Sequence, residues 1–184
     1  MKELKNYITS IHKSSKRDYL GRMLNEKAKC MKLAKKYDFD YWDGSRNTGY
    51  GGYKYIKGYW SDMAKKLIND YKLKDDSKVL DVGCGKSFLL HEMKLLKPNL
   101  NIMGFDVSNY GLQHNTELMK PFVYNQKAQE PFKYKNKEID LVISINTLHN
   151  LKLYDLKKSI LEINRVGKQA YIVVESYRNE KELF

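Results

Sequence analysis

The sequence is poor in cysteine, in histidine and in long apolar runs. Two cysteines among 184 residues are too few for a disulfide framework, so Cys30 and Cys84 are expected to be free thiols. The N-terminus lacks the apolar stretch of a signal peptide, and no segment approaches the roughly 18 uninterrupted apolar residues of a membrane span. His12, His91 and His114 show no metal-ligand spacing, so no metal is expected. These absences favour a cytoplasmic protein without a membrane span.

Acidic side chains are fewer than basic ones. The chain has 34 Lys and Arg against 22 Asp and Glu, for a formal net charge of +12. Most of the basic residues are lysines, spread along predicted helix faces instead of forming one block, which is typical of a solvated surface. Nucleic acid is therefore a disfavoured but open partner, and a small-molecule substrate is expected. An anionic substrate can also use this field.

The most informative segment is residues 78–87, with the sequence KVLDVGCGKS. Its apolar, β-branched start predicts a buried parallel strand, and Gly83 and Gly85 predict a turn where the backbone passes close to a ligand. Apolar residues at helical spacing then predict a helix that begins near Ser87. Asp106 comes 25 positions after Asp81, at the end of the next predicted strand, where a carboxylate can bind a ribose. Together these features predict a βαβ unit that binds a nucleoside.

A nicotinamide dinucleotide is the main alternative ligand for such a unit. Its fingerprint needs a third glycine three positions after Gly85, and this chain has Phe88 there, which would obstruct close helix packing. Asp81 would also repel a pyrophosphate, whereas its charge suits the cationic part of a sulfonium nucleoside. The sequence therefore favours the sulfonium nucleoside.

These motifs, together with residues 139–149, resemble the first, second and fourth motifs of class I S-adenosylmethionine-dependent methyltransferases, over residues 76–176. The resemblance implies an enzyme whose cofactor is S-adenosylmethionine. It implies that the glycine turn lines the methionine part of the cofactor, that Asp106 holds the ribose, and that Val107 flanks the adenine. The predicted cofactor-binding residues are Asp81, Gly83, Cys84, Gly85, Asp106, Val107, Gln126, Lys127, Ser144 and Asn146.

An aromatic and glycine-rich segment, residues 41–55, lies between two predicted helices that are expected to cover the sheet, one over residues 20–34 and one that begins at Ser61. Its length is unusual for a mere connection, and ring faces attract a sulfonium cation, so it is predicted to close over cofactor and substrate. The alternative is a packed Ω-loop with tyrosines as surface filler. The segment also resembles the N-terminal part of small bacterial methyltransferases of surface-carbohydrate and related small-molecule pathways. The predicted substrate or lid residues are Tyr41, Arg46, Tyr50, Tyr53 and Tyr55.

Polar residues follow the two last predicted strands. His149 is predicted to be the general base and Asn146 to lie with it at the reacting group; the alternative for His149 is a cap on the following helix. The chain lacks the Asn/Asp-Pro-Pro-Tyr motif here, which disfavours amino methylation of DNA bases or of glutamine. Glu175 follows the last strand as a candidate substrate contact, and an ion pair with Arg178 is an equal alternative.

The predicted architecture is an α/β, Rossmann-like parallel sheet with helices on both faces. Five strands are expected near residues 78, 101, 122, 140 and 170. Residues 1–75 are predicted to form a helical cover and the lid, and residues 76–184 the cofactor-binding domain, in one compact unit. The family fold implies a further C-terminal strand hairpin, whose apparent absence indicates a natural short form, a truncated chain or a second subunit, such as one of a homo-oligomer, that covers the edge.

Three functions remain open at this point. The first is methyl transfer to an oxygen or nitrogen of a small polar molecule, such as a sugar or a surface-polysaccharide precursor. The second is RNA methylation, and the third is S-adenosylmethionine binding without catalysis.

Overall fold

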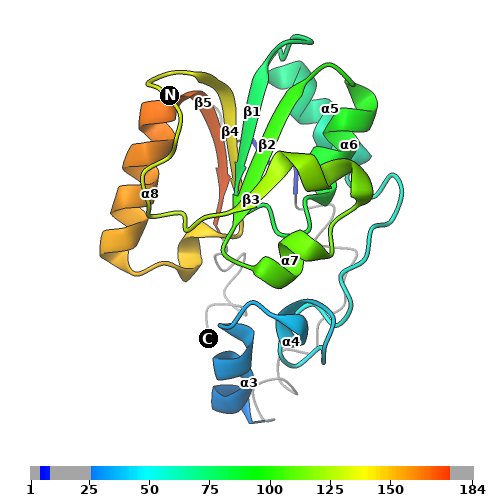
Figure 1. The fold of residues 1–184 in the computed structure, drawn as a ribbon, viewed down its shortest axis with the longest axis vertical. Coiled ribbons are helices and arrows are strands. Elements are labelled where there is room, and N and C mark those ends of the chain that lie inside the picture. The colour runs from blue at the N-terminus through cyan, green and yellow to red at the C-terminus, as the bar shows by residue number, and fades with distance from the viewer. Residues whose placement is uncertain (1–4, 9–25, 175–184) are drawn as a thin grey trace.

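The centre of the molecule is a five-stranded sheet in which every pairing is parallel (Figure 1). The computed structural model describes residues 5–8 and 26–174. The strand order is β3-β2-β1-β4-β5, which confirms the predicted α/β, Rossmann-like class. The strands are β1 (Lys78–Val82), β2 (Asn101–Asp106), β3 (Val123–Asn125), β4 (Ile139–Ile145) and β5 (Gly167–Val173).

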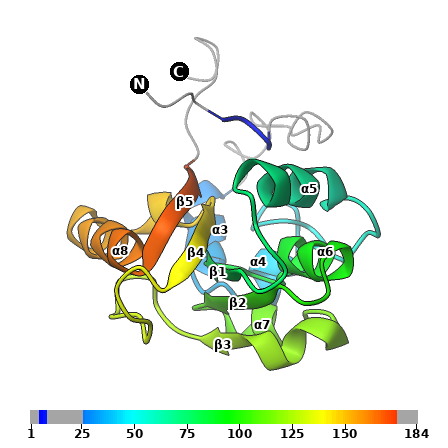
Figure 2. The ribbon, with the colours of Figure 1, turned by 90° about the horizontal axis from the view of Figure 1, so that it is seen from above.

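Helices cover both faces of this sheet (Figure 2). Helices α5 and α6 pack together on one face, and α8 lies on the other. The helices and 3-10 turns are α3 (Lys27–Ala34), α4 (Phe39–Trp42), α5 (Ser61–Asp70), α6 (Phe88–Leu96), α7 (Asn109–Gln113), η1 (Glu117–Phe122), η2 (Leu148–Asn150) and α8 (Leu153–Val166).

The core divides into two apolar clusters, one on each face of the sheet. Side chains two positions apart on a strand share a face. In β1, Val79 therefore joins the cluster under α5 and α6, whereas Leu80 and Val82 join the cluster under α8. Asp81 shares the face of Val79 and comes last in that row. The strand thus delivers a carboxyl group to the edge of an otherwise apolar layer.

The strand register brings three strand ends together. Strand β1 pairs with β2 through Val82 and Phe105, and with β4 through Asp81 and Ile143. The chain order of the strands reverses at β1, since β2 lies on one side and β4 on the other. Ligands of open parallel sheets bind at the carboxyl ends of the strands near such a reversal. The N-terminal helix α4 and the start of α7 lie at this end of the sheet (Figure 1).

The two predicted N-terminal helices differ in what they cover. Helix α5 buries Met63, Ala64 and Leu67, as its apolar spacing predicts. Of the helix expected around residues 20–34, the structure describes Lys27–Ala34, which buries no residue. The prediction that this helix covers the sheet is therefore wrong for the described part, because its side chains lie at least partly in solvent.

Strand β5 pairs with β4 and, within the described residues, with no other strand. Glu175 and the rest of the chain beyond Val174 lie outside the described residues. The expectation about the C-terminal hairpin and the role of Glu175 stay predictions.

Candidate functional site

The glycine turn after β1 is fixed by backbone hydrogen bonds to β2. The amides of Gly83 and Cys84 both donate to the carbonyl oxygen of Phe105, over 2.9 and 3.0 Å. Gly83 has a φ of 81°, and a Cβ atom there would lie 2.1 Å from Oγ1 of Thr147. Only glycine fits this position, because the backbone is left-handed and the space beside it is filled.

Asp106 joins this turn to the end of β2. Its Oδ2 accepts the amide hydrogen of Gly85 at 2.9 Å, and its Oδ1 accepts that of Ser108 at 2.8 Å. Burial raises the pKa of Asp106, although the hydrogen bonds from Ser108 and Gly85 act in the opposite direction. The backbone amide of Val107 also interacts with this carboxyl group. A carboxylate has about four acceptor sites, so about one remains for a ligand hydroxyl.

Asp81 lies beneath the same turn and is only 5% exposed. Burial, followed by the negative charge of Asp106, raises the pKa of Asp81 to about 8. The two carboxyl groups therefore interact, as the predicted cofactor site requires. At neutral pH Asp81 holds its proton, and a positively charged ligand nearby would favour its ionised form.

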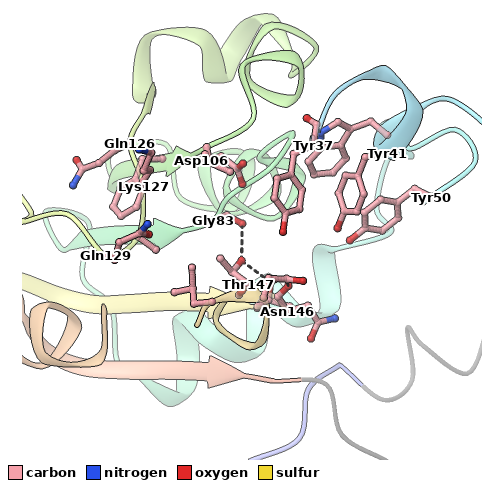
Figure 3. A pocket seen from close by; sticks show the side chains of 17 residues that line it. Tyr37, Tyr41, Tyr50, Gly83, Asp106, Gln126, Lys127, Gln129, Asn146 and Thr147 are labelled. Atoms are coloured by element: carbon pink, nitrogen blue, oxygen red, sulfur yellow. Dashed lines mark hydrogen bonds between the residues drawn. The ribbon is translucent and has the colours of Figure 1, made fainter. Parts of the chain in front are cut away.

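A cavity of about 280 Å³ opens at these strand ends (Figure 3). This volume is close to the lower end of the range of small-molecule sites, about 300 to 1,000 Å³. Its sheet-edge wall comes from the ends of β1, β2 and β4, and its aromatic wall comes from the segment before α5. The sheet-edge wall includes Gly83, Asp106, Val107, Asn146 and Thr147, the aromatic wall is Tyr37, Tyr41, Trp42 and Tyr50, and the far end holds Gln126, Lys127 and Gln129.

The aromatic wall is packed ring against ring. Trp42 and Tyr50 stack with centroids 5.3 Å apart, and Tyr41 meets both rings edge-on. The indole Nε1 of Trp42 donates to Oγ of Ser108 at 2.8 Å, which ties the wall to the loop after β2. Burial, followed by the charges of nearby groups, raises the pKa of the Tyr41 hydroxyl. Tyr41 is therefore a neutral hydrogen-bonding group and not a base at neutral pH.

The other three predicted lid residues support this wall and do not line the cavity. Arg46 donates a hydrogen bond to the carbonyl oxygen of Tyr50. The Tyr53 ring packs between Tyr50 and Phe88. The Tyr55 hydroxyl donates to the Glu92 carboxylate at 2.6 Å, and burial and this bond raise the pKa of Tyr55 to about 12.

Four predicted cofactor residues also lie outside the cavity lining. Cys84 is the second turn residue, and burial raises the pKa of its thiol well above the ordinary value, so it is unreactive. Gly85 lies against the Trp42 ring, since a Cβ atom there would come within 2.5 Å of Cη2. Ser144 is fully buried and donates to the carbonyl oxygen of Val82 at 3.0 Å, and Asp81 lies under the turn. These four residues therefore support the residues that line the cavity and do not line it themselves.

The segment after β4 places one of the two predicted catalytic residues at the cavity. Asn146 lines it, with a φ of 53°, a left-handed conformation that asparagine tolerates. The 3-10 turn η2 directs Leu148 into the core, while His149 is exposed and does not line the cavity. The geometry therefore does not bring His149 to the position that a general base would need.

Sequence reasoning missed several residues of the site. Tyr37 and Gln129 line the cavity. Thr147 and Asn150 also line it, but they belong to the polar segment after β4 that the sequence already predicts to face the reacting group. Trp42 lay within the segment singled out for its aromatic content, and that content was the available signal. The sequence held no comparable signal for Gln129, which reaches the cavity because of how the chain after β3 folds.

The described residues contain no group of three or more His, Cys, Asp or Glu side chains that could hold a metal ion. None of the helices described is long and apolar enough to cross a membrane.

The residues at the strand ends fit S-adenosylmethionine. Gly83 lines the cavity without a side chain, and Asp106 lines it beside the amides from which it accepts hydrogen bonds, with acceptor capacity left for a ribose hydroxyl. Val107, Phe105 and Leu151 supply apolar surface for a flat base. Asp81 and Asp106 lie close enough to interact, and a positively charged ligand would favour the ionised form of both carboxyl groups.

Comparisons with known proteins agree with this geometry. A family model described as a methyltransferase domain matches residues 73–184, more than half of the chain. A tRNA (guanine-N(7)-)-methyltransferase from Mycoplasma capricolum is 33% identical over 86 residues, which cover 44% of this chain and 38% of that protein. An uncharacterized protein from Methanocaldococcus jannaschii is 30% identical over 149 residues, which cover 80% of this chain and 49% of that protein. The chain thus spans half or less of the length of these two relatives.

Among solved structures, an amino pentose methyltransferase from Micromonospora echinaspora, with S-adenosylmethionine bound, superposes with a TM-score of 0.51 at 16% identity. It covers 66% of this chain and 52% of its own. Likeness at this identity shows the fold alone. The family match shows more, and with it the class and the cofactor predicted from the sequence are confirmed: this chain belongs to the methyltransferase domain family, whose cofactor is S-adenosylmethionine.

Proposed function

We propose that this chain transfers the methyl group of S-adenosylmethionine to an oxygen or nitrogen of a small polar molecule. The observation that carries this proposal is the single cavity that joins the glycine turn and Asp106 to the aromatic wall and Asn146. The first two features suit a nucleoside, and the last two suit a polar acceptor beside it.

The residues of the chain then act mainly by holding the cofactor and the methyl acceptor in position. The backbone at Gly83 and the carboxylate of Asp106 would hold the cofactor, which supplies the methyl group and a good leaving group when it is bound. The aromatic wall excludes water from the reacting atoms. Asn146 offers an amide donor and acceptor that can orient the methyl acceptor. Orientation of this kind supplies much of the acceleration when the leaving group needs no acid.

The acceptor decides whether a base is needed. A neutral amine keeps a free lone pair, whereas a hydroxyl must lose its proton as the methyl arrives. His149 is exposed beside the cavity and not in its lining, so a hydroxyl acceptor would require the turn η2 to move. The described geometry therefore favours an acceptor that is already nucleophilic.

A sugar or a surface-polysaccharide precursor that carries an amino group is the acceptor class that we propose. Tyr41, Tyr50 and Trp42 offer flat apolar faces with polar tips, and Asn146 and Asn150 add amide groups at the same end of the cavity. Such a combination can pack against a sugar ring while it hydrogen-bonds the ring substituents.

RNA is the second candidate, because one relative methylates tRNA by its name and the formal charge of +12 attracts polyanions.

Radiolabelled S-adenosylmethionine, incubated with the protein and a cell extract, separates the two candidate functions. Label in the metabolite fraction supports the first, and salt-sensitive label in RNA supports the second. Label in neither fraction, with calorimetric binding of S-adenosylhomocysteine intact, contradicts both and favours a non-catalytic binding protein. The Asp106→Ala variant is the control for cofactor-dependent transfer.

A further inference from the structure

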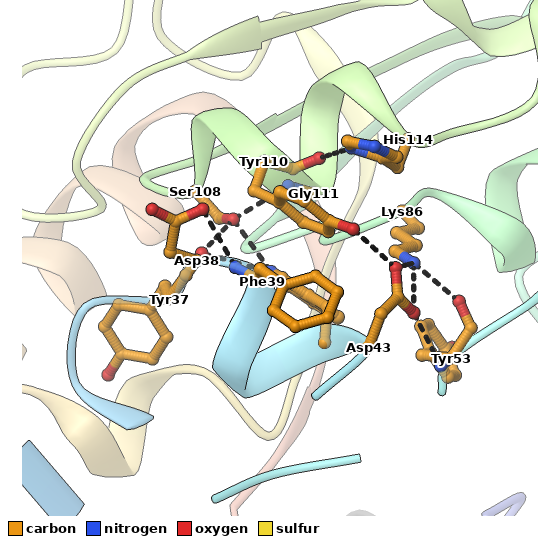
Figure 4. Close-up of polar contacts among 11 residues, drawn as sticks. Tyr37, Asp38, Phe39, Asp43, Tyr53, Lys86, Ser108, Tyr110, Gly111 and His114 are labelled. Atoms are coloured by element: carbon orange, nitrogen blue, oxygen red, sulfur yellow. Dashed lines mark hydrogen bonds and ion pairs between the residues drawn. The ribbon is translucent and has the colours of Figure 1, made fainter. Parts of the chain in front are cut away.

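An ion pair joins Lys86 to Asp43, the residue that follows Trp42 of the aromatic wall (Figure 4). Lys86 follows the glycine turn, yet its side chain is only 3% exposed. Its Nζ donates to both carboxylate oxygens of Asp43, at 2.8 and 2.7 Å, and to the carbonyl oxygen of Tyr53 at 2.8 Å. These three acceptors match the three donors of an ammonium group. In the sequence nothing distinguishes Lys86 from the other lysines, but in the fold its ammonium group has three defined acceptors.

Asp43 connects three separate segments of the chain. Besides Lys86, it accepts the hydroxyl of Tyr110 from α7 at 2.9 Å and the amide hydrogen of Tyr53 at 3.1 Å. Lys86 belongs to the loop after β1, and Tyr110 belongs to the helix after β2. Those two loops carry the glycine turn and Asp106, so Asp43 ties the aromatic segment to both cofactor-binding loops at once.

The residue before Asp43 links this connection to the shape of the cavity. Trp42 precedes Asp43, lies against Gly85 and Gly111, and lines the cavity together with Tyr50. Lys86 and Asp43 do not line the cavity themselves. They can influence a ligand only through the residues that they hold in place.

We propose that Lys86 and Asp43 are positioning residues that hold the aromatic wall against the cofactor loops, so that the cavity is formed before a ligand arrives. This inference rests on the proposed function for the identity of the ligand. Lys86 is 3% exposed and Asp43 19%, so the ammonium has lost its water and needs the carboxylate of Asp43 in this geometry. The ion pair therefore fixes the position of the aromatic segment more sharply than ring packing does, since aromatic pairs are stable over a range of offsets and centroid distances.

The test uses the full chain with Trp60→Phe, so that Trp42 becomes its one tryptophan and reports on the wall by its fluorescence. Lys86→Met removes the ammonium group and keeps a side chain of similar length. Asp43→Asn removes the negative charge and keeps the shape of the side chain. Lys168→Met is the matched control, because Lys168 pairs with Asp140 at 2.7 Å at the opposite end of the sheet. S-adenosylhomocysteine is the probe ligand, titrated by calorimetry and by emission.

We expect Lys86→Met and Asp43→Asn each to weaken probe binding about tenfold or more and to shift the emission of the ligand-free protein to longer wavelength. The double variant should bind about as weakly as either single one, because both remove the same interaction. Lys168→Met should change neither affinity nor emission. A melting temperature lowered with affinity and emission unchanged would show a merely structural pair and overturn the inference.

Two further results keep the outcome decisive. If Lys86→Met fails to fold, Tyr110→Phe removes one donor to Asp43 without removing a charge, and a smaller shift of affinity and emission in the same direction is expected. Wild-type affinity and emission in that variant would overturn the inference. If the unaltered chain binds no probe, the proposed function fails, while the emission of the ligand-free variants still decides whether the pair positions Trp42.

Discussion

The two walls of the cavity are built in different ways. The sheet-edge wall is held by backbone: the register of β1 and β2 places Gly83 beside Phe105, and Asp106 is fixed by two amide hydrogens. The aromatic wall is held by side chains from distant segments, such as the Trp42 bond to Ser108 and the ion pair of Asp43 with Lys86. Changes in the first wall should therefore damage the fold and the ligand site together, whereas changes in the second should spare the sheet.

The strongest test of this difference is Gly83→Ala. A Cβ atom at Gly83 would lie 2.1 Å from Oγ1 and 2.6 Å from Cβ of Thr147, at a φ of +81°. Strain and overpacking each cost about 1 to 3 kcal/mol. Since 1 kcal/mol shifts the melting temperature of a chain this long by roughly 2 to 4 °C, a loss of roughly 4 to 24 °C is expected. Thermal unfolding followed by circular dichroism measures it, together with loss of S-adenosylhomocysteine binding.

Gly52→Ala is the matched control within the aromatic segment. Gly52 also has a positive φ, +99°, but nothing lies within 4 Å of an added Cβ atom. It should therefore show the strain of the backbone without the clash, about 1 kcal/mol. Equal losses in the two variants would mean that contact with Thr147 does not matter.

Asp106→Ala should have the next largest effect, on binding and also on stability, because the amides of Gly85 and Ser108 lose their acceptor. Hydrogen bonds to a charged group contribute about 1.5 to 3 kcal/mol, so the affinity for S-adenosylhomocysteine should fall roughly 10- to 100-fold, as calorimetry can show. Asp140→Ala is the control, since Asp140 also accepts a backbone amide hydrogen, from Lys78 at 2.8 Å, but at the other end of the strands. A similar loss of affinity in both variants would contradict the assignment of Asp106 to the ligand.

The same contrast explains what the sequence could predict. The five strands, the glycine turn and Asp106 follow from local patterns: apolar runs, glycine spacing and an acid after a strand. Lys86 could not be identified in this way, because a lysine among 34 basic residues carries no signal until the fold brings Asp43 beside it. His149 failed to reach the cavity for a similar reason. The turn η2 buries Leu148, and the next side chain, His149, is therefore exposed to solvent.

A third experiment concerns Asp81, which is buried under the glycine turn and outside the cavity lining. Its pKa is about 8 in the folded protein, against an ordinary value of 3.8. Between these values the folded state holds a proton that the unfolded state has released. Stability of the ligand-free protein should therefore fall as pH rises toward about 8, by at most about 1.4 kcal/mol per pH unit, and then level off. Melting temperatures from pH 5 to 9, compared with those of Asp81→Asn, measure this slope.

The ligand should reverse part of this dependence. A positively charged ligand favours the ionised carboxyl, so the affinity for S-adenosylhomocysteine, whose amino group is charged, should rise with pH up to about 8, the pKa of Asp81. The Asp81→Asn variant should bind with little change over the same range. An identical pH profile in both proteins would show that Asp81 does not face the charge of the ligand.

The smallest effect is expected for His149→Ala, and it sharpens the comparison at the third strand end. His149 is exposed and outside the lining, whereas Asn146 lines the cavity three positions earlier. Loss of the imidazole should change stability by no more than about 0.5 kcal/mol and probe affinity by less than about twofold, since 1.4 kcal/mol corresponds to a factor of ten. Asn146→Ala should lower transfer to the acceptor found in the labelling experiment far more. If His149→Ala instead abolishes transfer while binding stays intact, the turn η2 must move during the reaction, and the acceptor is then a hydroxyl that needs a base rather than an amine that brings its own lone pair.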